Sequence, residues 1–166
     1  MGASVIQRDT QLRQTPGGLV LPLPSPLLAM LPPALQGLPM QYWLQPINWL
    51  NLIHNTTIPG QFVTDSSHYL AAWYGCISVR SSDNQTDRPN EPLFAQITDT
   101  HNLNYNPAQT PIDVRNFLGS AQLPAVWPAP LIVPPNSGLV MQLTNNDNVN
   151  ALNVQVVFVG VLITAQ

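Results

Sequence analysis

The sequence predicts an all-β protein, a sandwich or barrel of about seven or eight short strands in one domain. Short apolar stretches alternate with turns rich in Pro, Gly, Asn and Asp along most of the chain. No stretch carries the apolar spacing of a long helix, and the 18 prolines oppose one. The 166 residues suffice for one domain with a core of its own.

The N-terminal part predicts an arm before the barrel. Residues 1–16 are polar, and residues 17–60 are apolar sequence divided by prolines, without a charged residue between Arg13 and Asp65. We expect residues 1–40 to be an arm with little regular structure, apart from a helical turn near 27–31, and residues 41–166 to be the barrel. Two interpretations fit the apolar part: a first strand with loops that wrap the barrel, or an arm that packs on a neighbouring subunit or a lipid surface.

From residue 61 onward the pattern is that of strands. We expect strands at 62–64, 69–79 and 93–99, with Gly75 as a candidate bulge, and a short extended piece between 110 and 119. Polar loops separate them at 80–90 and 101–109.

The C-terminal third continues this pattern. Apolar pieces at 125–127 and 131–133 lead into a Pro-Pro-Asn-Ser-Gly corner, a strand at 139–144 and a turn at 145–148. In the last strand Leu152, Val154, Val156 and Phe158 face one way, whereas residues 157–163 are apolar on both faces. A strand of that kind lies in a sandwich centre or against a partner.

Charge is scarce. Charged residues make up 8% of the chain, against about 25% in typical soluble domains, and there is no lysine. Either the source genome has a biased composition, or neighbouring subunits bury much of the surface. The net charge is −3 and the five arginines are scattered, so we expect no nucleic-acid partner.

No pattern predicts catalysis, a cofactor or a metal, and we expect no enzyme. The histidines at 54, 68 and 101 form no metal-binding spacing. Glu91 and Asp99 flank one predicted strand, as unrelated loop acids would also do. Cys76 lies in an apolar run and is expected to be a buried, inert thiol. No signal peptide or membrane-spanning helix is visible.

Aromatic residues leave two interpretations open. They could form a sugar-binding platform, or they could be anchors of the core and of subunit interfaces. Indole and phenol rings suit the second role because each combines a large apolar area with one polar group, an N–H or an O–H. The set comprises Tyr42, Trp43, Trp49, Tyr69, Trp73, Tyr74 and Trp127.

The second half of the chain, about residues 60–166, resembles β-sandwich structural proteins of bacteriophage virions. It is most similar to the small single-jelly-roll major capsid protein of icosahedral phages that enclose a membrane, such as those of Thermus. The resemblance rests on strand-and-corner patterns: FAQITD at 94–99, PIDV at 111–114, FLG at 117–119, LPA at 123–125, PLIVPPNSG at 130–138 and VVFVGV at 156–161.

This resemblance implies a single jelly roll of about eight antiparallel strands that builds a viral shell. Its partners would be further copies of itself and other capsid proteins, and its location the virion. Residues 17–50 would be a swapped arm, a dimer contact or the part that faces the internal membrane. Two alternatives are a decoration or head-fibre protein of a tailed phage and a carbohydrate-binding module for host attachment.

Overall fold

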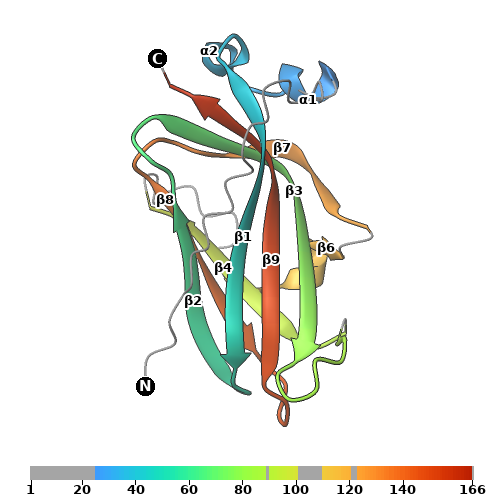
Figure 1. Ribbon diagram of the computed structural model, residues 1–166. Helices are drawn as coiled ribbons and strands as arrows, with labels where there is room; N and C mark the ends of the chain where they lie inside the picture. Colours follow the sequence, from blue (N-terminus) through green and yellow to red (C-terminus); the bar gives the residue numbers. More distant parts are fainter. Residues whose placement is uncertain (1–24, 89, 101–109, 121–122, 166) are drawn as a thin grey trace.

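The computed structural model describes residues 25–88, 90–100, 110–120 and 123–165 and is mostly β (Figure 1). Two short helices precede the strands. The elements are α1 (Ser25–Ala29), α2 (Pro33–Gln36), β1 (Met40–Leu52), β2 (Thr56–Val63), β3 (His68–Ser81), β4 (Leu93–Asp99), β5 (Ile112–Asp113), the 3-10 turn η1 (Val114–Asn116), β6 (Gly119–Ser120), β7 (Ala125–Val133), β8 (Gly138–Asn145) and β9 (Leu152–Thr164).

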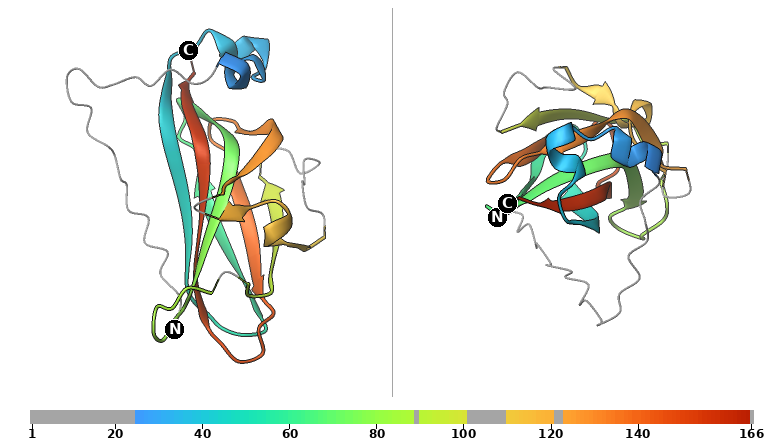
Figure 2. Two further views of the ribbon diagram at one scale, coloured as in Figure 1. Left: turned by 90° about the vertical axis from the view of Figure 1, so that its right-hand side faces the viewer. Right: turned by 90° about the horizontal axis from the view of Figure 1, so that it is seen from above.

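The strands form two sheets that pack as a sandwich. Sheet A has the order β1-β9-β3, with β7 pairing antiparallel to β3 and the short β6 pairing parallel to it. Sheet B has the order β2-β8-β4-β5, in which every pairing is antiparallel. Figure 2 shows the sandwich from the side and from above, with the helices at the upper end. The all-β, sandwich-like fold predicted from the sequence is therefore confirmed.

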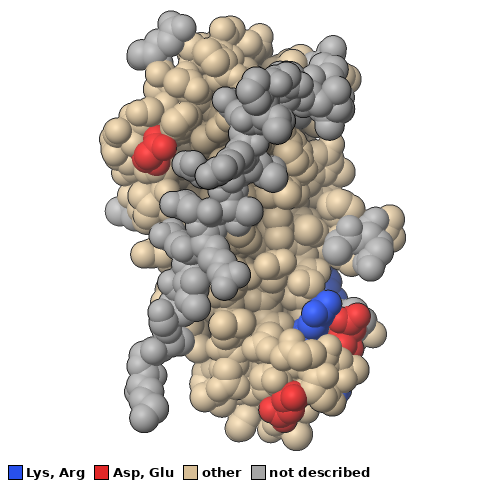
Figure 3. Space-filling view, viewed as in Figure 1, with Lys and Arg blue, Asp and Glu red and all other residues tan. Residues whose placement is uncertain are grey.

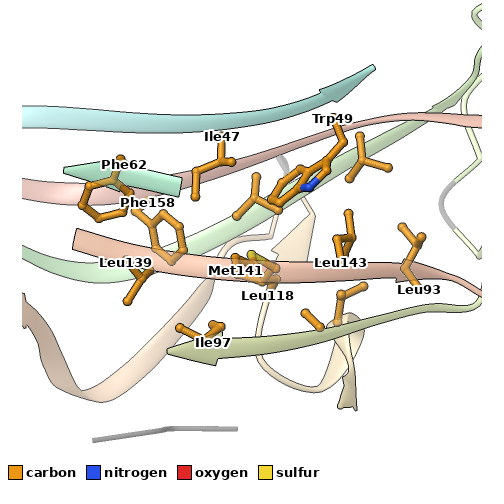
Figure 4. Close-up of a cluster of buried hydrophobic side chains, with 14 of the residues drawn as sticks. Ile47, Trp49, Phe62, Leu93, Ile97, Leu118, Leu139, Met141, Leu143 and Phe158 are labelled. Carbon is orange, nitrogen blue, oxygen red and sulfur yellow. The ribbon is translucent and has the colours of Figure 1, made fainter. Parts of the chain in front are cut away.

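The main core lies between the sheets and follows the alternation of the strands (Figure 4). Phe62 of sheet B lies 5.9 Å, centroid to centroid, from Phe158 of sheet A, and Trp127 lies at the same distance from Phe158. Two indole groups reach this core with their N–H groups satisfied: Trp49 donates to the Ile58 carbonyl at 2.9 Å, and Trp127 donates to the Phe117 carbonyl at 2.8 Å. Each large ring is buried at no cost in unpaired donors.

A second, smaller core lies on the outer side of sheet A. Leu31 and Leu35, from the helical region, pack over Ala71, Trp73, Val161 and Ile163. This explains why β9 is apolar on both faces toward its end: its inner side chains enter the main core, and Val161 and Ile163 are covered by the chain's own helices. The indole nitrogen of Trp73 is buried in this cluster and has no hydrogen-bond partner among the described residues.

Several elements differ from the sequence prediction. Gly75 is not the bulge: the register of β3 shifts between Ala72 and Tyr74, around Trp73. Gly75 is instead a packing position, because a Cβ there would come within 2.4 Å of Leu118. The pieces expected at 125–127 and 131–133 are one strand, β7, and η1 interrupts the extended piece expected after residue 110. The helical turn expected at 27–31 overlaps α1, whereas residues 1–24 and the loop at 101–109 lie outside the described residues.

Candidate functional site

Charge lies at the ends of the sandwich. Within the described strands, Arg80, Asp99 and Asp113 are the charged residues, and each is the last or next-to-last residue of its strand. Most other charged residues occupy the loops after β3 and β8, at the lower end of Figure 1; these are Asp83, Asp87, Arg88, Glu91 and Asp147. In Figure 3 the coloured side chains accordingly gather toward the lower end, with one acidic side chain near the upper end.

The outer side of sheet A carries an apolar surface that spans its strands. Paired residues of neighbouring strands point to the same side. Leu44 therefore stands beside Val159, Val159 beside Tyr74, and Tyr74 beside Val126. We call the following set the apolar face: Tyr42, Leu44, Pro46, Tyr74, Cys76, Val126, Val157 and Val159.

Much of the apolar face is accessible. Tyr42 is 57% exposed, Leu44 46% and Val126 61%, and Tyr74, Val157 and Val159 are half-buried. The set contains no charged side chain. Burial and the nearby Cys76 and Tyr74 raise the pKa of the Tyr42 hydroxyl, so that side chain is also neutral at physiological pH. An apolar surface of this kind typically marks a contact with another surface.

Sheet B presents a different outer surface, which is more polar and carries one charged side chain, Asp113, on its edge strand β5. Its outward side chains include Thr57, Gln61, Gln142 and Thr144, and the hydroxyls of Thr57 and Thr144 lie 2.8 Å apart. We call this the polar face. It offers hydroxyl and amide groups that can hydrogen-bond to a neighbour without the cost of burying a charge.

Prolines occupy the edge strands of both sheets. Pro46 lies in β1 and Pro59 in β2, while Pro128 and Pro130 lie in β7. Proline has no N–H to donate to an added strand, so these edges are poor templates for edge-to-edge pairing. Contacts with other molecules are therefore favoured at the faces and loops.

The described histidines are not brought together. His54 follows β1 at the lower end and is exposed, whereas His68 begins β3 at the upper end, where its Nδ1 lies 2.7 Å from Asp65. His101 lies outside the described residues. Among the described residues, no cluster of three or more His, Cys, Asp or Glu side chains could hold a metal ion.

The acids flanking β4 lie at opposite ends of that strand. Glu91 meets a different acid, Asp147, which the sequence spacing did not suggest. Burial, together with the contact with Asp147, raises the pKa of Glu91. Hydrogen bonds from the Asn150 side chain and the backbone N–H groups of Val149 and Asn150 hold the pKa of Asp147 well below its ordinary value.

This contact shapes the turn between β8 and β9. Arg88 adds an ion pair to Glu91, with 3.5 Å between nitrogen and oxygen. These contacts join the loops after β3 and β8 at the lower end of the sandwich. The hydrogen bonds that Asp147 accepts stabilise its negative charge, so the conformation of the two loops is explained by contacts within the protein.

Two further candidates from the sequence have structural explanations. Cys76 is half-buried, and burial raises the pKa of its thiol, which disfavours the reactive thiolate. Trp49 and Trp73 are buried, and Trp43 and Trp127 are half-buried, so the described tryptophans form no exposed stacking platform.

Comparison with known proteins gives no family: no family model matches the sequence, and no curated protein is significantly similar to it. Within the described residues, no helix is both long and apolar enough to cross a membrane.

Proposed function

We propose that this chain is a structural protein of a viral capsid, assembling with copies of itself and with other capsid proteins through lateral contacts into an icosahedral shell. The single observation that carries the proposal is the distribution of charge. Among the described side chains, charge on the two broad faces is limited to Arg80, next to the end of β3, and Asp113, on the short edge strand β5, and most other charged residues lie in the end loops. Subunits that stand side by side in a shell bury their broad faces against one another. Burying a charge is costly unless it is paired, so such faces are expected to carry little charge.

The order of the strands supports a jelly roll. With β6 set aside, the sheets are β1-β9-β3-β7 and β2-β8-β4-β5, so the chain crosses between sheets at most of its connections. This is the order expected of an eight-stranded jelly roll, the fold of many viral capsid proteins and of lectins. Because the same fold serves several functions, the choice among them rests on the surfaces.

The surfaces favour assembly over the alternatives. A lectin of this fold would display several exposed aromatic rings for sugar stacking, whereas among the described members of the aromatic set Tyr42 alone is exposed and the others are buried or half-buried. The proline-bearing edges direct contacts to the faces. A decoration protein of a tailed phage is the second candidate of the same class, because such a protein would also need broad faces that are poor in charge.

Particle analysis tests the proposal. We expect mass spectrometry of virus particles from a culture that produces this chain to find it in many copies per particle, retained under mild washing. Loss of the chain on mild washing, with intact shells left behind, would favour a decoration protein. Its absence from particles would contradict the proposal.

Single charges on the faces test the assembly surfaces directly. Leu44→Arg alters the apolar face and Gln142→Arg the polar face, while Asn148→Arg places the same charge in an exposed turn. We expect light scattering to show smaller assemblies for at least one face variant and wild-type assemblies for the turn variant. Equal assembly of all three variants would contradict a lateral role for the faces.

The proposal extends to a shell that encloses a lipid membrane. Lipid extracted from gradient-purified particles, in a constant ratio to this chain, would support that extension. Infectious particles without lipid would contradict the internal membrane but not the shell-forming role.

A further inference from the structure

We propose that the apolar face of sheet A binds the same face of a second copy of this chain, so that two molecules form a symmetric dimer. The inference deepens the proposed function, and it rests on that function for the choice of another copy as the partner. It assigns one defined contact to one of the two broad faces of the sandwich.

The outer side of sheet A has an apolar centre and a polar border. Val157 and Val159, on the central strand β9, lie in the apolar part. The next row along the strands is polar and uncharged: Gln155 stands between Asn48 and Ser78, and its amide donates to the Asn48 side chain at 2.8 Å. An apolar centre with a polar rim is the usual anatomy of a protein–protein interface.

The position of charge allows this face to meet its own copy. The chain has a net charge of −3, so two copies repel each other where their charged residues come close. On the outer side of β3 the charged residue is Arg80, beyond the polar row, and its Nε lies 3.1 Å from Asp87. Two apolar faces can therefore come together without burying an unpaired charge. A lipid surface is a poorer match, because none of the side chains in the set is basic.

The area of the outer side is sufficient for a small interface. From Tyr42 to Leu50, β1 extends about 30 Å, and four paired strands span about 19 Å across the sheet. These dimensions give about 500–600 Å² per copy, or about 1,000–1,200 Å² for two copies. That total is close to the lower bound for a specific interface, so we expect a weak dimer that dissociates on dilution.

Symmetry and the strand edges favour contact between faces. When the same patch is used by both copies, the assembly closes as a dimer and leaves no free apolar patch of that kind. Pairing between edge strands is the alternative route to a dimer, but Pro46 in β1 and Pro59 in β2 oppose it.

Sedimentation velocity of the purified full-length chain over a range of concentrations tests the dimer. Val126→Asp should raise its dissociation constant about tenfold or more, because each symmetric dimer would contain two unpaired carboxylates at the contact. Val63→Asp is the matched control: Val63 is also 61% exposed but ends β2 in sheet B, and its variant should dimerise like the wild type. Circular dichroism checks that both variants fold. A wild-type chain that stays monomeric, or equal effects of the two variants, would overturn the proposal.

Chemical cross-linking locates the contact. Cys76 is the only cysteine, so Cys76→Ser provides a background without thiols in which any link must join two copies. Ser78→Cys and Gln142→Cys, both at exposed positions, would be treated separately in this background with a flexible bismaleimide. Packed sheets lie about 10 Å apart, so the two Ser78 positions come within about 17 Å when the two-fold axis passes near Val157.

We expect linked dimers from Ser78→Cys and few from Gln142→Cys, which lies on the polar face. Equal linking at both positions would overturn the assignment of the contact to sheet A. The dimer and the capsid role can fail separately. A chain that is abundant in virus particles but monomeric when purified would overturn the dimer alone. A chain that dimerises through sheet A but is absent from particles would contradict the capsid role and support the contact.

Discussion

The side-chain amide of Asn145 donates a hydrogen bond to the backbone carbonyl of Leu52 at 3.0 Å and so joins the end of β8 in sheet B to the end of β1 in sheet A. The same nitrogen donates to the carbonyl of Asn150 at 2.9 Å. Asn145 is fully buried, so the buried carbonyl of Leu52 depends on it, and the half-buried carbonyl of Asn150 shares the same donor. One amide thus closes the lower end of the sandwich.

Replacement of Asn145 by Ala should destabilise the protein by about 2–3 kcal/mol, because the buried carbonyl of Leu52 and the half-buried carbonyl of Asn150 lose their donor. Urea unfolding followed by tryptophan fluorescence would measure the change. The matched control is Asn148→Ala in the same turn, where the side chain is exposed and the effect should stay within about 0.5 kcal/mol. Equal effects at both positions would contradict the role of Asn145.

Gly160 permits a close approach of backbone within sheet A. A Cβ at this position would lie 1.9 Å from the carbonyl oxygen of Ala71 and 2.6 Å from the Ala72 Cα, so backbone would have to move. We expect Gly160→Ala to cost about 3 kcal/mol or more, or to prevent soluble expression. Gly37→Ala is the control, since no atom lies within 4 Å of its added Cβ; a comparable loss there would show that the effect is not steric.

Glu91 should oppose folding when it is ionised. Its pKa is raised in the folded protein, so the folded state binds the proton more tightly than the unfolded state, and stability declines as pH rises through the carboxyl range. Glu91→Gln removes that charge and can still donate to Asp147. The variant should therefore gain unfolding free energy relative to wild type at pH 7 and lose the gain near pH 3. An equal gain at pH 7 and pH 3 would contradict a role for the charge of Glu91.

Asp147 should have the opposite dependence. Its pKa lies below the ordinary value, so it contributes stability above about pH 4 that is lost as the pH falls further. Asp147→Asn weakens the hydrogen bonds to Val149 and Asn150, and its thermal midpoint should fall most at neutral pH. If the difference in thermal midpoint between the variant and the wild type stays constant from pH 7 to pH 2, the carboxylate charge is not responsible for it.

Leu31 holds the helical region to sheet A. Its side chain is 2% exposed and packs into the cluster with Trp73, so Leu31→Ala should cost about 2–4 kcal/mol. Met30→Ala, one residue earlier and more exposed, should cost much less. Limited proteolysis should cut the Leu31→Ala variant first before residue 40. If cleavage begins elsewhere, the helices are not the part that is released.

Elements whose side chains alternate between core and solvent could be predicted from the sequence. The strand expected at 93–99 has those bounds, because Leu93, Ala95 and Ile97 face the core and their neighbours do not. The length of β1 could not be predicted in this way. Pro46 lies within it and reads as a break, yet an edge strand accommodates a proline.

The candidate surfaces depend on register, which a single sequence does not contain. Leu44, Val159 and Tyr74 are far apart along the chain and become neighbours only through the pairings of β9 with β1 and β3. The contact between Glu91 and Asp147 arises in the same way, from two loops that follow different strands. Scarcity of charge was visible at once, but its restriction to the ends required the fold.

The pairing of Met40 with Ile163 places the start of β1 and the finish of β9 together at the upper end, beside α2, while the turn after β8 lies at the other end (Figure 1). A protein engineer can therefore address the two ends separately. A fluorescent domain fused after residue 165 would emerge next to the helices, and a peptide inserted between Asp83 and Asn84, in the exposed loop after β3, would emerge on the opposite side. A domain or peptide attached at either place would leave both broad faces of the sandwich uncovered.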